Sequence, residues 1–374
     1  MSQFRTDLCD LLGVEYPILQ SGMGGVAGPD LVAEVCEAGG LGILAGLNLT
    51  PDALRAGIAR IRSLTRRPFG VNLWFHRAIR PPADPAAIPD ATIGPVQDVL
   101  NGFRARLGLP AVTRRPDPLP DLAETAFEVI LEERVPVWSL GLGDPGPERV
   151  RRCHDRGVKV VAMIATVEDA RTVAAAGVDV VVAQGSEAGG HRSTWVKRES
   201  REAASIGTMA LVPQVVDAVS VPVVAAGGIA DGRGLIGALA LGASGILLGT
   251  RFVATRESGA PEFWKKALLE RGSDATTVTD AFTGLYARTL VNTFNAEYAE
   301  SGAPVLPPLL QSRAAMDIYT ESAKQETGEY YPMHTGQSVG LVHSLPGAGE
   351  VVREIVREAS AVLAALPGRV RMLQ

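Results

Sequence analysis

Eight short runs of apolar and β-branched residues recur between positions 17 and 249, and helix-like segments separate most of them. Such runs are typical of strands that are buried on both faces of a parallel sheet. Strands that alternate with helices predict βα units, and eight of them predict an α/β fold, the closed (β/α)8 TIM barrel. The runs are Pro17–Gln20, Leu41–Ala45, Phe69–Trp74, Val135–Leu140, Lys159–Ile164, Val178–Ala183, Val221–Ala226 and Gly245–Gly249.

The helix-like segments carry recognisable stop signals. Asp30–Ala38, Val167–Ala176 and Arg233–Leu241 each end at a glycine, and a strand-like run follows after a few residues. Glycine is the usual residue just past a helix C-terminus because it adopts the left-handed conformation without strain. The repetition indicates one structural unit used several times.

Two segments depart from this alternation. Residues 77–120 are rich in Pro and Asp and contain a probable helix around Gly94–Leu107, so we expect an inserted connection after the third strand. Residues 256–374 are expected to form a helical C-terminal extension with two or three helices, packed as a cap on a barrel domain of residues 1–255. The last helix, Val351–Leu363, has one apolar face that would cover the barrel or, alternatively, bind a partner.

Charge and cysteine content exclude several classes of protein. The net charge is −5, which favours neither a nucleic-acid nor a membrane partner. The 3 cysteines show no metal-ligand spacing, and they do not suggest a disulfide framework. No apolar run reaches the ~18 residues of a membrane span. We expect a cytoplasmic enzyme with no metal, and a homodimer is possible.

The segment Gln184–His191 is the strongest candidate for chemistry, because it brings polar groups to the end of a buried strand. Its glycines permit a tight turn and close approach of a ligand to the backbone. His191 is the one side chain in it that exchanges a proton near neutral pH. Glu187 would either orient this ring or fix the loop, and Arg192–Ser205 reads as a solvated loop beside it.

Glycines after the last two strands suggest a phosphate site. Gly227 and Gly228 follow the seventh run, and Gly249 and Thr250 end the eighth. Barrels of this kind commonly hold a phosphate on these two loops, through backbone N–H groups. Ordinary βα turns are the alternative reading, since they also favour glycine.

The turn after the first strand and two carboxamide side chains could face a planar cofactor. Gly22 and Gly24 flank Met23 after the first strand, where bare backbone would accept a ring, although a tight turn with a core methionine fits equally well. Asn72 and Gln184 place carboxamides in buried strands, where they must find partners, and each can pair with a heterocycle. No nucleophile elbow, HExxH helix or Walker motif is present, so hydrolysis and metal chemistry have little support.

Together these residues resemble the nitronate monooxygenase family, formerly the 2-nitropropane dioxygenases, which are FMN-dependent TIM barrels. The similarity covers nearly the whole barrel and extends weakly into the C-terminal part. The matching segments are Gln20–Gly25, Gly39–Leu44, Phe69–Leu73, Gln184–His191, Leu211–Gln214, Ala226–Gly234 and Leu241–Phe252, with Tyr286–Asn292 and Gly336–Gln337 further on.

The resemblance implies oxidation of nitronates or nitroalkanes by O2 to a carbonyl compound and nitrite. His191 would be the catalytic base, and Met23, Trp74 and Phe75 would form an apolar rim for a small alkyl substrate. The residues expected to bind FMN are Gly22, Met23, Gly24, Asn72, Gln184, Gly189, Gly190, Gly227, Gly228, Gly249 and Thr250.

Two observations keep other functions open. The family usually continues His-x-Gly, but here Arg192-Ser193 follows His191, and a cation at the mouth would favour nitronates that bear a carboxylate. An FMN-dependent NAD(P)H reductase, of the second enoyl-acyl-carrier-protein type or acting on quinones, shares the fold. Enoyl reductases more often carry Ser where Ala188 stands. A barrel that binds a phosphate ligand without catalysis is the alternative of another class.

Overall fold

A barrel of eight parallel strands forms the body of the protein in the computed structural model, which describes residues 4–77, 79–194 and 205–369. The strand order is β1-β9-β8-β6-β5-β4-β3-β2, and a parallel bridge between Leu19 and Leu41 joins the two ends. All eight predicted runs are strands of this barrel. They are β1 Ile18–Gln20, β2 Ile43–Ala45, β3 Gly70–Phe75, β4 Val137–Gly143, β5 Lys159–Ile164, β6 Val180–Gln184, β8 Val223–Ala226 and β9 Gly245–Leu248.

Helices surround the barrel, and apolar side chains between the helices and the sheet form the larger core. Seven of these helices lie between consecutive strands of the described chain: α2 Pro29–Glu37, α3 Pro51–Leu64, α5 Ala123–Glu132, α6 Pro147–His154, α7 Val167–Ala175, α8 Thr208–Ala218 and α9 Gly232–Ala240. The short α10 Thr250–Val253 follows β9, and α15 Ala348–Arg369 packs against both α9 and α2. The last helix therefore occupies the eighth position of the ring.

The interior of the barrel is a second core of Val, Leu and Ile side chains. The N-terminal helix α1 Asp7–Leu12 adds Leu8, Cys9 and Leu12 to this core. This arrangement leaves the opposite rim, where the strands end, for a ligand.

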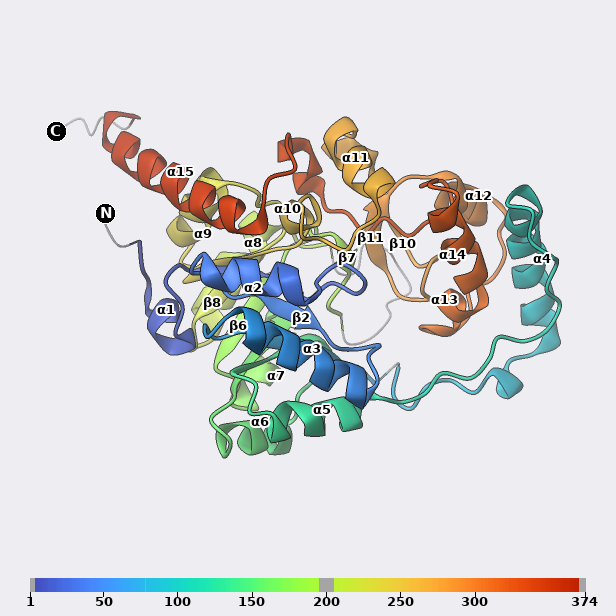
Figure 1. Ribbon diagram of the computed structural model, residues 1–374, viewed down its shortest axis with the longest axis horizontal. Coiled ribbons are helices and arrows are strands. Elements are labelled where there is room, and N and C mark those ends of the chain that lie inside the picture. The colour runs from blue at the N-terminus through green and yellow to red at the C-terminus, as the bar shows by residue number, and fades with distance from the viewer. Residues whose placement is uncertain (1–3, 78, 195–204, 370–374) are drawn as a thin grey trace.

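The insertion after β3 contains the predicted helix, α4 Asp90–Arg106, which begins four residues earlier than Gly94. It packs away from the barrel against C-terminal helices, as Figure 1 shows at the right. The C-terminal part is richer in structure than the two or three helices expected. Its described residues form α11 Glu262–Glu270, α12 Thr293–Glu300, α13 Leu310–Ala314, α14 Met316–Lys324 and α15, together with strands β10 Thr276–Thr279 and β11 Ala287–Leu290.

The extra strands connect the C-terminal part to the barrel rim. β11 pairs with β10 and with β7 Gly190–His191, so that Ala287 lies opposite His191. These short strands were not expected, because their pairing joins segments that are far apart in the sequence. Within the described residues, no helix is both long and apolar enough to span a membrane.

Candidate active site

A cavity of about 890 Å³ lies at the rim where the barrel strands end, between the barrel and the C-terminal part. Eleven of the twelve residues predicted for the site line it: Gly22, Met23, Gly24, Asn72, Gln184, Gly189, Gly190, His191, Gly227, Gly249 and Thr250. Gly228 does not, and its α-carbon faces the side chain of Glu187 instead. The rim loops therefore meet around one cavity, as parallel strands require.

The rim glycines serve two different purposes. A side chain at Gly22 would place its Cβ 2.4 Å from the Cβ of Asn72, and one at Gly189 would lie 2.4 Å from the backbone nitrogen of Gly336. The protein's own packing thus requires glycine at both positions. At Gly24 no atom lies within 4 Å of such a Cβ, and at Gly249 the nearest is the Met23 sulfur at 3.6 Å. At these two positions the bare backbone borders open space that a ligand can fill.

The two buried carboxamides, of Asn72 and Gln184, differ in the number of hydrogen bonds that they form with other protein atoms. The Asn72 amide donates to Ser139 Oγ at 3.1 Å. Gln184 donates from Nε2 to the backbone oxygen of His191 at 2.9 Å and accepts from the backbone nitrogen of Ser193 at 2.8 Å. Gln184 consequently fixes the turn that carries His191, in addition to lining the cavity.

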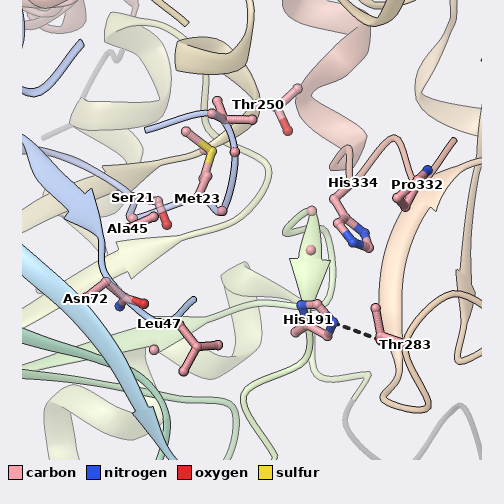
Figure 2. A pocket seen from close by; sticks show the side chains of 18 of the residues that line it. Ser21, Met23, Ala45, Leu47, Asn72, His191, Thr250, Thr283, Pro332 and His334 are labelled. Atoms are coloured by element: carbon pink, nitrogen blue, oxygen red, sulfur yellow. Dashed lines mark hydrogen bonds between the residues drawn. The ribbon is translucent and has the colours of Figure 1, made fainter. Parts of the chain in front are cut away.

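His191 has one ring nitrogen held by the protein and one that is open. Its Nε2 lies 2.9 Å from Thr283 Oγ1, drawn as the dashed line in Figure 2. The Thr283 hydroxyl donates to the backbone oxygen of Leu285 at 3.2 Å, so its oxygen accepts a proton from His191. This assigns the proton to Nε2 and leaves Nδ1 as an acceptor, with no partner among the described residues.

Burial, and then the neighbouring ring of His334, lower the pKa of His191 well below its usual 6.5. Burial likewise lowers the pKa of His334 to about 4. Both imidazoles are therefore neutral at pH 7. Trp74 and His191 pack edge-to-face with the ring centroids 4.8 Å apart. A neutral imidazole held in this way is suited to accept a proton.

Glu187 fixes the loop and does not orient the ring. Its carboxylate accepts from the backbone nitrogen and hydroxyl of Thr208, at the start of α8. Of the two roles considered for this residue, the structure supports the loop anchor.

The expectation of a cation at the mouth is wrong. The Arg192 side chain is buried, with 5% of the residue exposed, and its guanidinium donates to the backbone oxygens of Gly185 and Gln184. Ser193 is also buried, so the solvated loop does not begin at Arg192 as expected. Residues 195–204 of that loop lie outside the described residues.

The apolar rim is only partly as expected. Met23 and Trp74 line the cavity, but Phe75 points outward and packs edge-to-face on Phe127 and Trp138. Successive side chains of a strand face opposite sides, so Trp74 and Phe75 could not both face the cavity.

Sequence reasoning missed the far wall of the cavity, which belongs to the C-terminal part. Only the weak matches at Tyr286–Asn292 and Gly336–Gln337 pointed to this region. The wall includes Thr283, His334 and Ser338, together with Met316, Tyr319, Thr320, Ala323 and Lys324 from one face of α14. Among the residues described, no group of three or more His, Cys, Asp or Glu side chains is placed to hold a metal ion.

Comparison with known proteins identifies the family. The family model for nitronate monooxygenase matches residues 5–358. A probable nitronate monooxygenase of Staphylococcus saprophyticus is 34% identical over 96% of this chain and 99% of its own length. A probable nitronate monooxygenase of Staphylococcus aureus is 32% identical over 96% of this chain and 98% of its own length.

Two solved structures extend the comparison. The nitroalkane oxidase of Streptomyces ansochromogenes is 37% identical, covers 96% of this chain and 99% of its own, and superposes with a TM-score of 0.87. FabK of Thermotoga maritima is 31% identical, covers 98% of this chain and 99% of its own, and has a TM-score of 0.76.

Proposed function

This chain belongs to the nitronate monooxygenase family of flavin-dependent oxidoreductases, and from this premise we propose that it binds FMN and oxidises alkyl nitronates and nitroalkanes with O2. The products would be a carbonyl compound and nitrite. The observation that carries the proposal is the open Nδ1 of His191, which lies on a cavity bordered by bare backbone at Gly24 and Gly249.

The residues present fit FMN. We propose that the backbone around Gly227, Gly249 and Thr250 binds the phosphate and that Met23, Asn72, Gln184 and Gly189 surround the ring system. Open space beside Gly24 and Gly249 provides the cradle, since any side chain there would project into it. FMN supplies the redox chemistry, and the protein contributes binding, orientation and exclusion of side reactions.

His191 would act on the substrate's α-carbon. Nδ1 accepts the α-proton of a neutral nitroalkane, which leaves the nitronate, and the resulting imidazolium N–H can hydrogen-bond that anion. Thr283 keeps the ring in place during the transfer by holding Nε2. A substrate supplied as the nitronate has already lost this proton and would not need His191 as a base.

The two parts of the chain would contribute differently to the site. Residues 1–255 would supply the FMN site, and residues 256–374 would cover it and shape the substrate end of the cavity. Met316, Tyr319 and Thr320 on α14 lie on that wall.

Anaerobic mixing of the FMN-loaded protein with ethyl nitronate, and separately with NADPH, tests the proposal. We expect loss of the oxidised flavin absorbance with the nitronate alone. Reduction by NADPH alone would instead indicate the alternative function, an FMN-dependent NAD(P)H reductase. A protein that stays colourless in excess FMN would favour the non-catalytic alternative.

A further inference from the structure

The segment Met333–Gln337, which we call the strap, runs along the cavity and is held by hydrogen bonds on all sides. Met333 O accepts from the backbone nitrogen of Leu290 at 3.0 Å and from Thr289 Oγ1 at 2.7 Å. Further along, Thr335 Oγ1 accepts from the Trp264 indole at 3.0 Å, the Gly336 nitrogen donates to Thr250 Oγ1 at 2.9 Å, and the Gln337 nitrogen donates to Glu187 O at 2.9 Å. The strap is therefore a fixed element of the site.

The strap presents one ionisable side chain to the cavity, His334. Its ring centroid lies 5.1 Å from that of His191, with the rings inclined by 54°, and Figure 2 shows the two rings close together on the same side of the pocket. The ring of Phe282 packs against His334 from another direction, with centroids 6.4 Å apart. No hydrogen bond joins the two imidazoles among the bonds of the described residues.

The surroundings of the ring indicate which nitrogen carries the proton. Nδ1 of His334 is fully buried and has no hydrogen-bond partner. A buried N–H without an acceptor is rarer and costlier than a buried lone pair without a donor. The neutral ring then carries its proton on Nε2, the other ring nitrogen, which is not among the fully buried atoms without a partner. His334 therefore presents an N–H donor to the cavity.

The geometry points to a role for this donor, and this inference rests on the proposed function: we propose that His334 is a second substrate-binding residue, whose Nε2–H donates to an oxygen of the nitro or nitronate group. In such a substrate one nitrogen atom separates the α-carbon from each oxygen. Two neighbouring rings can therefore serve both ends of the group, with the acceptor of His191 at the α-proton and the donor of His334 at the oxygen.

This pairing would assist the proton transfer itself. Negative charge develops on the nitro oxygens as the α-proton leaves, and a donor already in position stabilises that charge more in the transition state than in the ground state. His334 would thus contribute to the turnover of neutral nitroalkanes as well as to the binding of preformed nitronates.

Binding of propionate to the FMN-loaded protein, measured by calorimetry, tests the inference without turnover. Propionate is a non-reacting anion whose planar carboxylate resembles the charged end of ethyl nitronate in size and shape. The His334→Phe variant keeps a ring against Phe282 but has no donor, and we expect its Kd for propionate to rise about ten- to hundredfold, as for a lost hydrogen bond to a charged group. His334→Asn, which restores an N–H, should recover part of the affinity.

The matched control is His343→Phe, the same change at an exposed histidine outside the cavity, and it should leave the Kd unchanged. An unchanged Kd in His334→Phe, or no propionate binding by the wild-type protein, would overturn the inference. If the variant does not fold, ¹⁵N spectra of the wild-type histidines decide, because a His334 nitrogen resonance must move when propionate binds. Failure of the proposed function would be seen separately, as absence of nitronate oxidation by the wild-type protein.

Discussion

At the scale of single residues, Thr283 determines which nitrogen of His191 is open to a substrate. Its hydroxyl proton is used by Leu285 O, so its oxygen accepts the Nε2 proton of His191. The tautomer of His191 is thus set by a residue outside the barrel strands.

Replacing His191 should separate the two substrate forms. His191→Asn removes the proton acceptor but keeps a polar side chain, so we expect kcat/KM for nitroethane to fall about 10²–10⁴-fold, the usual contribution of a general base. With preformed ethyl nitronate the loss should be much smaller. Steady-state oxygen consumption with both substrates measures the difference, and equal losses would contradict the assignment of His191 as the base.

The pH dependence of nitroethane turnover should reflect the lowered pKa of His191. Only the neutral ring accepts a proton, so kcat/KM rises with pH and levels off once the pH exceeds this pKa. Because burial and the neighbouring His334 place the pKa well below 6.5, we expect a plateau of kcat/KM around neutral pH, with the acid limb only well below pH 6.5. Initial rates of oxygen consumption between pH 5 and 7.5 would show it, and an inflection near pH 7 would argue against a buried neutral base.

At the scale of elements, the insertion after β3 supports the helix that forms the substrate wall. Arg104 on α4 is buried and donates to Asp317 Oδ2 on α14 at 2.7 Å and to the backbone oxygen of Ala314 at 2.6 Å. It also donates to Gln97 and Asn101 on its own helix. The insertion is therefore linked to the cavity through α14.

Loss of this link should affect both stability and substrate binding. In Arg104→Met two buried acceptors, Ala314 O and Gln97 Oε1, lose their donor, at a cost of about 1–3 kcal/mol for each group left without a partner. We expect a lower free energy of unfolding in urea and a higher KM, because α14 is then less well fixed. Arg106→Met, a change on the same helix as Arg104, is the control. Arg106 forms an exposed pair with Glu297 of α12, and such pairs contribute little. Equal effects of the two changes would contradict this role of Arg104.

At the scale of the whole molecule, distant parts of the chain complete the barrel and its site. Helix α15 fills the eighth helix position, and β11 pairs with the strand that carries His191 (Figure 1). A ligand bound between the barrel rim and the C-terminal part should consequently raise the free energy of unfolding of both parts together. Ligand at a hundredfold excess over its Kd contributes about 2.7 kcal/mol.

FMN should therefore raise the Tm of the wild-type protein, and Gly249→Val should abolish this shift. The valine side chain would occupy the cradle, while its Cβ meets no protein atom closer than the Met23 sulfur at 3.6 Å, so the Tm without FMN should change little. Gly94→Ala on α4, whose Cβ also meets open space, is the control and should keep the full FMN shift. Thermal melts with and without FMN measure both, and an intact shift in Gly249→Val would contradict the placement of FMN.

The sequence by itself determined the barrel and most of its rim. Strand runs and glycine stops are local signals, and strands of a parallel barrel end at one rim, so Gly22, Gly249 and His191 could be placed around one cavity before the structure was known. The roles of these residues stay predictions. The local pattern also led to the wrong prediction that Arg192 is exposed. Whether a charged side chain is buried depends on which carbonyl oxygens lie within hydrogen-bond distance in the folded chain.

Only the tertiary structure decided what faces the rim. Thr283 lies 92 residues after His191, and its contact with that ring depends on the pairing of β11 with β7. His334, the face of α14 and the position of α15 likewise depend on contacts between distant segments. Such contacts produce no periodic pattern of residues in the sequence. They depend on which distant segments become neighbours in the folded chain and not on the spacing of residues along it.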